Sequence, residues 1–211
     1  MAGVTGVILA GGNSRRMGSN KALLPYCGGR FIEAIYRQMV ELFHEVLLVT
    51  NTPEQYAFLP CRKVADIYSG MGALAGLHAG LFHSAGSCMF AVGCDMPYLN
   101  SCLIRRIAAL HDGADVVIPH GDKGVEPLHA LYGKACLAPM EQALLTGEKR
   151  IVSFFPGVRV SHLSRADVAA LDPAFDSFRN INTPQEYFDL RDSERDAVPG
   201  HQTIRLRGER G

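Results

Sequence analysis

The sequence predicts an α/β fold, in which helices cover both faces of an open and mostly parallel sheet. Short apolar runs typical of buried strands alternate along the chain with longer amphipathic segments typical of helices. A chain of 211 residues suits one such domain with a sizeable core, whereas two full domains would be cramped. We expect this single domain to span residues 1–190, and the charged, apolar-poor stretch 191–211 to form a flexible tail.

The first half of the chain supplies strands and helices in alternation. Residues 4–10 form an apolar run that ends in glycines, as a fully buried strand does. The segment 31–43 is predicted to be a helix, because its apolar residues recur at spacings of three and four. Further strands are expected at 45–50 and, as a short segment, at 63–66, and the small-residue segment 73–84 is predicted to be a second helix.

The second half continues this alternation and then departs from it. A strand is predicted at 88–93, a helix at 101–111 and a strand at 114–119. Beyond residue 121 the candidate elements are a strand at 127–132, a helix at 134–145, an edge strand at 158–163 and a helix that begins at Thr183. In this last helix Thr183 would be the N-cap, Pro184 the first helical residue, and Glu186 would complete a capping box.

The composition excludes several classes of protein. Lys plus Arg and Asp plus Glu both number 21, so the formal net charge is zero. This balance gives no reason to expect nucleic acid or an anionic membrane as a partner. No apolar run reaches the roughly 20 residues that a membrane helix needs. The first residues lack the basic region of a signal peptide, and the six cysteines form no Cys-x-x-Cys pair. We therefore expect reduced thiols and a cytoplasmic location.

The segment 9–21, LAGGNSRRMGSNK, carries the clearest functional signal. Gly11 and Gly12 let the backbone approach a ligand closely, and successive amides in such a turn form a concavity that binds anions. Arg15, Arg16 and Lys21 add positive charge, so the loop offers what a triphosphate needs. The spacing matches neither a Walker A motif nor a dinucleotide fingerprint. The alternative is a plain strand-to-helix turn with a solvated basic face.

Two aspartates follow predicted strands at the edge where ligands bind in open α/β sheets. Asp95 comes just after the strand at 88–93 and could hold Mg²⁺, which takes few protein carboxylates together with phosphates and water. Asp66 could contact a ribose hydroxyl or the base. Either aspartate could instead cap the turn that follows it. His129 is the histidine that could lie beside an acceptor pocket, although a role as core or surface filler is more common.

No Gly-x-Ser-x-Gly elbow is present, and no serine or cysteine stands out as a nucleophile. Cys94 stands beside Asp95, but burial as a small hydrophobic residue is the commoner fate of a cysteine. The lack of a nucleophile fits phosphoryl-type transfer, in which positioning and charge neutralisation supply most of the catalysis.

Several segments together resemble the signature of the molybdenum cofactor guanylyltransferases. They are the loop 9–21, Asp66, Leu-Ala-Gly at 74–76, Cys-Asp-Met-Pro at 94–97, Pro-Leu-His-Ala-Leu-Tyr at 127–132 and Asn-Ile-Asn-Thr-Pro at 180–184. The likeness spans nearly the whole chain apart from the tail. It implies a single Rossmann-like nucleotidyltransferase domain that transfers GMP from GTP to molybdopterin. Pyrophosphate would be released and the guanine dinucleotide cofactor formed.

The resemblance also implies a role for each site residue. Those expected to bind the nucleotide are Leu9, Ala10, Gly11, Gly12, Lys21, Asp66 and Asp95. Asp95 would also hold Mg²⁺, and it would form the catalytic set with Arg16 and Lys21. Asn180 and Asn182 are expected near the pterin or its phosphate. Proteins that deliver molybdopterin and that mature molybdoenzymes are implied as further partners.

The chain departs from the family pattern at two positions. Asn20 stands where the family often has Asp, and Ala73 stands where it often has Pro. Neither change removes a residue that the chemistry needs.

The residues leave other activities open. The nucleotide could be CTP or the acceptor a sugar or alditol phosphate, although those relatives more often have Leu-Ala-Ala-Gly in the loop. A nucleotide sensor or cofactor chaperone on the same fold is a third possibility, but a sensor need not keep a metal site. In the favoured mechanism the terminal phosphate of molybdopterin attacks the α-phosphate of GTP. This phosphate has a second pKa of about 6 and is therefore mostly a dianion at neutral pH, so its attack needs no general base.

Overall fold

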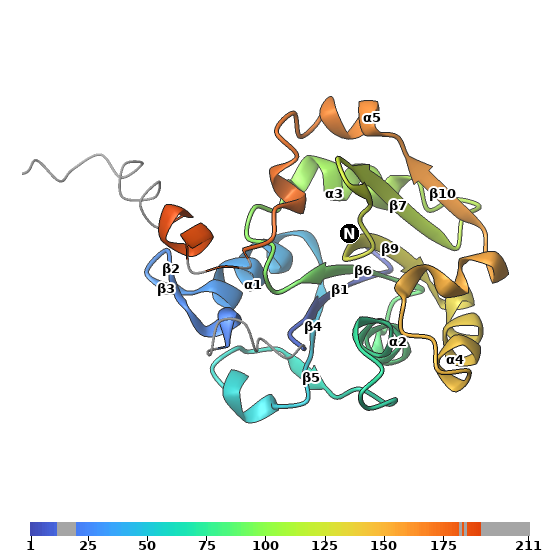
Figure 1. Cartoon of the computed structure of the whole chain (residues 1–211), viewed down its shortest axis with the longest axis horizontal. Coiled ribbons are helices and arrows are strands. Elements are labelled where there is room, and N and C mark those ends of the chain that lie inside the picture. The colour runs from blue at the N-terminus through green and yellow to red at the C-terminus, as the bar shows by residue number, and fades with distance from the viewer. Residues whose placement is uncertain (12–19, 182, 184, 191–211) are drawn as a thin grey trace, which may run out of the picture.

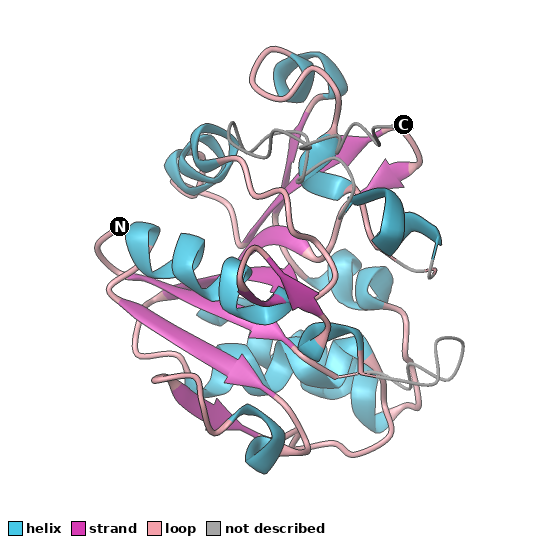
Figure 2. Cartoon of the chain, turned by 90° about the vertical axis from the view of Figure 1, so that its left-hand side faces the viewer, coloured by secondary structure: helices cyan, strands magenta, loops and turns pink. Residues whose placement is uncertain are grey.

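The computed structural model describes residues 1–11, 20–181, 183 and 185–190. An 8-stranded sheet runs through the molecule in the order β10-β7-β9-β6-β1-β4-β5, with β8 paired to β7 (Figure 1). Helices lie on either side of its strands (Figure 2). The predicted fold class is therefore confirmed. The division at residue 190 stays a prediction, because the tail 191–211 lies outside the described residues.

The parallel half of the sheet is built from the strands that the apolar runs predict. Its members are β1 (Val4–Leu9), β4 (Glu45–Val49), β5 (Arg62–Val64) and β6 (Cys88–Gly93). β1 lies at the centre and pairs in parallel with both β4 and β6. Almost every residue of β1, β4 and β6 is buried, which explains why these strands appear as continuous apolar runs rather than as alternating patterns.

The other half of the sheet is mixed. Its strands are β7 (Val116–Gly121), β8 (Gly124–Val125), β9 (His129–Gly133) and β10 (Val160–Leu163). β9 runs antiparallel to both β6 and β7, whereas β10 pairs in parallel with β7. The segment predicted to be an edge strand therefore forms an edge of the sheet.

Two hydrophobic cores separate the helices into two layers. One core contains side chains of α1 (Phe31–Leu42), α3 (Ser101–Ala109) and α5 (Arg165–Ala169). The other contains those of α2 (Ala73–His83) and α4 (Leu137–Leu145). The remaining short elements are β2 (Pro25–Tyr26), β3 (Gly29–Arg30), η1 (Lys21–Leu23), η2 (Pro53–Tyr56), η3 (Lys134–Cys136), η4 (Ile151–Gly157) and η5 (Asp176–Phe178). The prediction of helices on both faces is confirmed.

The helix predicted near the C-terminus begins as its sequence indicates. Thr183 Oγ1 accepts a hydrogen bond from Glu186 N at 3.2 Å, and Thr183 N donates to Glu186 Oε2 at 2.8 Å. This reciprocal pair is the predicted capping box. The helix occupies 185–190, and Pro184 lies outside the described residues.

The lengths of the helices and the state of the cysteines bear on the class of protein that the composition predicts. Among the described residues, every helix is too short or too polar to span a bilayer. None of the six cysteines, all of which lie among the described residues, forms a disulfide.

Candidate active site

The carboxyl ends of β1 and β6 lie side by side at the centre of the candidate site. Cys94 N donates to Leu9 O at 3.1 Å, and Ala10 N donates to the last carbonyl of β4 at 2.9 Å. Leu9 and Ala10 are buried and Gly11 is exposed, so the chain leaves the sheet at this point and reaches the surface. Three predicted residues of the following loop lie outside the described residues: Gly12, Arg15 and Arg16.

Lys21 and Asp95 act on each other electrostatically at this edge of the sheet. Lys21 begins η1, and the half-buried Asp95 follows β6 by two residues. Burial raises the pKa of Asp95, while its own backbone amide and the charge of Lys21 oppose that rise. Burial also raises the pKa of Cys94 to about 12, so this thiol stays protonated. The structure thus brings together a cation and a carboxylate, whose catalytic roles stay predictions.

Asn20 fixes the start of the turn that carries Lys21. Its side-chain oxygen accepts from Ala22 N at 3.2 Å, and its amide group donates to Gln55 Oε1 and Tyr56 Oη, both at 2.9 Å. Tyr56 is 1% exposed, so these bonds anchor the turn to the hydrophobic core. The sequence marked Asn20 only as a departure from a family pattern. Its partners lie 35 and 36 residues away in the chain, and the local sequence does not reveal them.

Replacing Asn20 with alanine is expected to raise the KM for the nucleoside triphosphate about fivefold to tenfold, with a smaller change in kcat. Alanine removes hydrogen bonds that hold the turn of Lys21 in place, each worth about 1 kcal/mol. Steady-state kinetics with varied nucleotide measure the effect. Asn20→Asp is the matched control, because aspartate can cap the same turn and accept from the Tyr56 hydroxyl. An unchanged KM for the nucleotide in the alanine variant would contradict the positioning role.

Asp66 is held in place by Asn51, a residue that the sequence did not single out. Asn51 Nδ2 donates to Asp66 Oδ2 at 2.8 Å, and Asp66 N donates to Asn51 Oδ1 at 3.0 Å. Gly76 of α2 packs beside them: a Cβ there would lie 2.6 Å from Leu9 Cδ2 and 3.7 Å from Asp66 Oδ1. The missing side chain lets α2 approach the end of β1 closely. The side chains of Leu9 and Asp66 therefore both lie close to Gly76.

The chain returns to Asp95 after η5. Ile181 N donates to the backbone oxygen of Asp95 at 3.0 Å, and Ile181 itself is 2% exposed. The exposed Asn180 directly precedes Ile181 in the chain, so it is the neighbour of a residue that is hydrogen-bonded to Asp95. One predicted acceptor residue therefore adjoins, along the chain, the residue that bonds to the backbone of the predicted metal ligand, and its role stays a prediction. The other, Asn182, lies outside the described residues.

His129 lies beneath the surface. Its side chain is 0% exposed and packs between the rings of Phe90 and Phe178, at centroid distances of 5.1 and 5.3 Å. Burial lowers the pKa of His129 to about 3, and the nearby Asp172 opposes this shift only in part. The ring is therefore neutral at physiological pH. Its proposed place beside an acceptor pocket stays a prediction.

The described residues suit a divalent ion that a nucleotide brings with it. Among them, no three His, Cys, Asp or Glu side chains gather as ligands for a metal ion. Mg²⁺ at phosphate sites commonly uses one or two protein carboxylates, with phosphate oxygens and water completing its shell. Asp95 offers a half-buried carboxylate at the edge of the sheet where Lys21 also lies, which fits this chemistry.

A family model for the MobA-like NTP transferase domain matches residues 6–163. The chain belongs to this family. Within the matched range of this MobA-like transferase lie Lys21, Asp66 and Asp95, together with the sheet from Gly6 of β1 to Leu163 of β10.

Relatives of this MobA-like transferase match along most of their length. It is 36% identical to the "Probable molybdenum cofactor guanylyltransferase" of Pelotomaculum thermopropionicum, over 90% of this chain and 93% of that protein. It is also 36% identical to the "Molybdenum cofactor guanylyltransferase" of Desulfosudis oleivorans, over 88% of this chain and 93% of that protein. Both relatives carry the activity in their names.

A solved structure agrees with the fold of this MobA-like transferase. The molybdopterin-guanine dinucleotide biosynthesis protein A of Archaeoglobus fulgidus superposes with a TM-score of 0.79 at 25% identity. The superposition covers 91% of this chain and 99% of that chain. The comparison of structures therefore supports the same family as the comparison of sequences.

Proposed function

We propose that this MobA-like transferase transfers GMP from GTP to molybdopterin, forming the guanine dinucleotide cofactor and releasing pyrophosphate. The observation that supports this proposal is that the charge of Lys21 acts on Asp95 at one edge of the sheet, where Ile181, the neighbour of Asn180 in the chain, bonds to the backbone of Asp95. The relatives named as molybdenum cofactor guanylyltransferases support the choice of substrates.

The proposed chemistry is an attack by the acceptor phosphate on the α-phosphate of GTP. One phosphate oxygen of molybdopterin forms a bond to the α-phosphorus, and the bond from that phosphorus to the β-phosphate oxygen breaks, so pyrophosphate leaves. A phosphomonoester with a second pKa near ~6 is mostly a dianion at neutral pH, so no general base is required. The neutral, buried His129 fits a site without one.

The main task of the protein is then to bring two anions together. We propose that Lys21 and Arg16 neutralise the phosphates, and that Leu9, Ala10, Gly11, Gly12 and Asp66 hold the nucleoside part of GTP. Nucleotidyltransferases of this kind generally use a divalent metal, and we propose Mg²⁺ on Asp95. When bound, such an ion supplies charge stabilisation to the phosphates. Asn180 and Asn182 would hold the acceptor.

The expected cellular setting follows from this activity. We propose a cytoplasmic enzyme that receives molybdopterin from a delivering protein and passes the product to proteins that mature molybdoenzymes. Six cysteines without a disulfide among them are consistent with a reducing compartment.

A nucleotide competition tests the proposed activity. With purified protein, molybdopterin and Mg²⁺, we expect pyrophosphate release from GTP to exceed that from CTP by about 100-fold, a gap that base-specific hydrogen bonds can supply. Chromatography of the products identifies the dinucleotide. A preference for CTP would reverse the choice of nucleotide. GTP binding without pyrophosphate release would instead indicate a sensor or chaperone.

A further inference from the structure

The backbone of Glu126 is held by hydrogen bonds close to the end of β6. It lies in the loop between β8 and β9, where its amide donates to Pro119 O and its carbonyl accepts from His129 N, both at 3.0 Å. In the same loop Leu128 O accepts from Gly93 N at 3.3 Å, which ties this loop to the end of β6. Glu126 therefore sits beside the strand that leads to Asp95.

The carboxylate of Glu126 lies in a partly buried corner beside Gly121 and Phe178. A Cβ added to Gly121 would lie 2.6 Å from Glu126 Oε1 and 3.0 Å from Phe178 Cδ2, so the carboxylate and the ring share the space above this glycine. Burial raises the pKa of Glu126 to about 7, and the charge of Lys123 opposes this only in part. Within the part of the chain that the structure describes, neither a hydrogen-bond donor nor an ion-pair partner reaches this carboxylate.

The surroundings of Phe178 hold further unpaired polar atoms. Both ring nitrogens of His129 and the Oγ of Ser177 are buried without hydrogen-bond partners among the described residues. The side chains of His129 and Ser177 are 0% and 1% exposed. Buried polar groups normally have partners, and exceptions gather at functional sites. Three residues after Phe178, Ile181 N donates to the backbone oxygen of Asp95.

This corner suits a flat ring with two adjacent N–H groups. A carboxylate accepts two parallel hydrogen bonds from such an edge, and an aromatic ring beside it provides an apolar contact for a planar ligand. The 2-amino-4-oxopyrimidine edge has this pattern, and both pterin and guanine carry it. We propose that Glu126 binds the 2-amino-4-oxopyrimidine edge of the pterin acceptor, an inference that rests on the proposed function for its choice of ligand.

Pterin and guanine both carry this ring edge, and the order of the strands distinguishes where each would bind. Asp66, assigned to the nucleoside of GTP, follows β5, whereas Glu126 precedes β9. Between these two strands lie β6, β1 and β4. At about 4.8 Å between neighbouring strands, the backbones of β5 and β9 are about 19 Å apart along the sheet. Glu126 thus lies on the β9 side of Asp95 and Asp66 on its β5 side, and we assign the Glu126 site to the acceptor for this reason.

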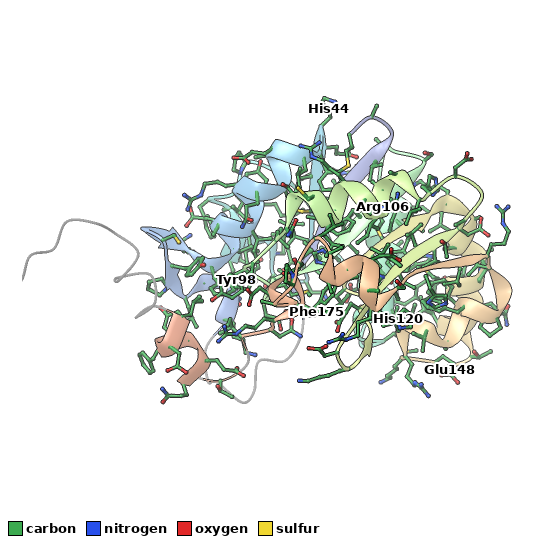
Figure 3. All side chains as sticks on the ribbon, turned by 90° about the horizontal axis from the view of Figure 1, so that it is seen from above. His44, Tyr98, Arg106, His120, Glu148 and Phe175 are labelled. Atoms are coloured by element: carbon green, nitrogen blue, oxygen red, sulfur yellow. The ribbon has the colours of Figure 1, made fainter. Side chains whose placement is uncertain are left out.

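Binding of free pterin tests the proposal without requiring turnover. The intrinsic fluorescence of 2-amino-4-oxopteridine is titrated with wild-type protein, Glu126→Gln and Glu148→Gln. Glu148 is exposed in the segment that follows α4 (Figure 3), outside the loop that carries Glu126, so its substitution is a control matched in charge. We expect Glu126→Gln to weaken pterin binding about tenfold or more, because a charge-assisted pair is lost. The Glu148→Gln protein should bind like the wild type.

A parallel titration with GTP distinguishes the two ligands. Glu126→Gln should bind GTP with unchanged affinity, and this result also shows that the variant is folded. The proposal is overturned if wild-type protein does not bind pterin, if Glu126→Gln binds it normally, or if the substitution weakens GTP binding equally. Pterin binding that depends on Glu126 would stand even if no guanylyl transfer were detected, so the two proposals fail separately.

Discussion

Replacing Asp95 with asparagine is expected to lower kcat for guanylyl transfer about a thousandfold or more. Asparagine keeps the size of the side chain and leaves the bond from Ile181 N to the backbone oxygen of residue 95 intact. It removes the negative charge that a divalent ion requires, and such ions supply several kcal/mol of charge stabilisation in phosphate chemistry. Pyrophosphate release at saturating GTP and molybdopterin measures the loss.

The matched control for this variant is Asp112→Asn, which changes an exposed aspartate in the loop after α3. That protein should retain wild-type turnover. If Asp95→Asn keeps activity within about tenfold of the wild type, the residue neither holds the metal nor contributes to the transition state, and the assignment of the site is wrong.

The sequence predicted strands and helices well where burial alone decides the structure. The apolar run that became β1 and the three-and-four spacing that became α1 both reflect simple periodicity. Periodicity does not report direction, so the antiparallel course of β9 between β6 and β7 could not be predicted. The helix expected at 134–145 begins with η3 and continues as α4, with Pro139 in its first turn, where the missing N–H costs little.

The candidate site divides in the same way. Lys21 and Asp95 could be predicted because each follows a buried strand in a short, dense motif. Asn51 and Glu126 could not, because their importance depends on neighbours that the fold supplies. The carboxylate of Glu126 is unusual because the fold partly buries it, with Gly121 beside it and Phe178 on the same side of that glycine. Such contacts join distant parts of the chain, and no local pattern encodes them.

Replacing Lys21 with methionine is expected to reduce kcat/KM for GTP about 100-fold to 1000-fold. Methionine has a similar length but no charge, so it removes the cation that we propose to face the phosphates and leaves the packing of η1 largely intact. Initial rates at low GTP concentration measure the effect. Lys149→Met, at an exposed position, is the matched control and should behave as the wild type. A loss below about fivefold would contradict a phosphate-binding role.

The double variant Lys21→Met/Asp95→Asn decides whether the two residues serve one ligand. The charge of Lys21 already acts on the Asp95 carboxylate in the free protein. If both also contact the same triphosphate and its metal, removing the second residue should cost much less than it does in the wild type. Residues that act as a unit are strongly non-additive in this way. Losses in kcat/KM that simply multiply would mean that Lys21 and Asp95 act at independent sites, and the shared nucleotide site would have to be abandoned.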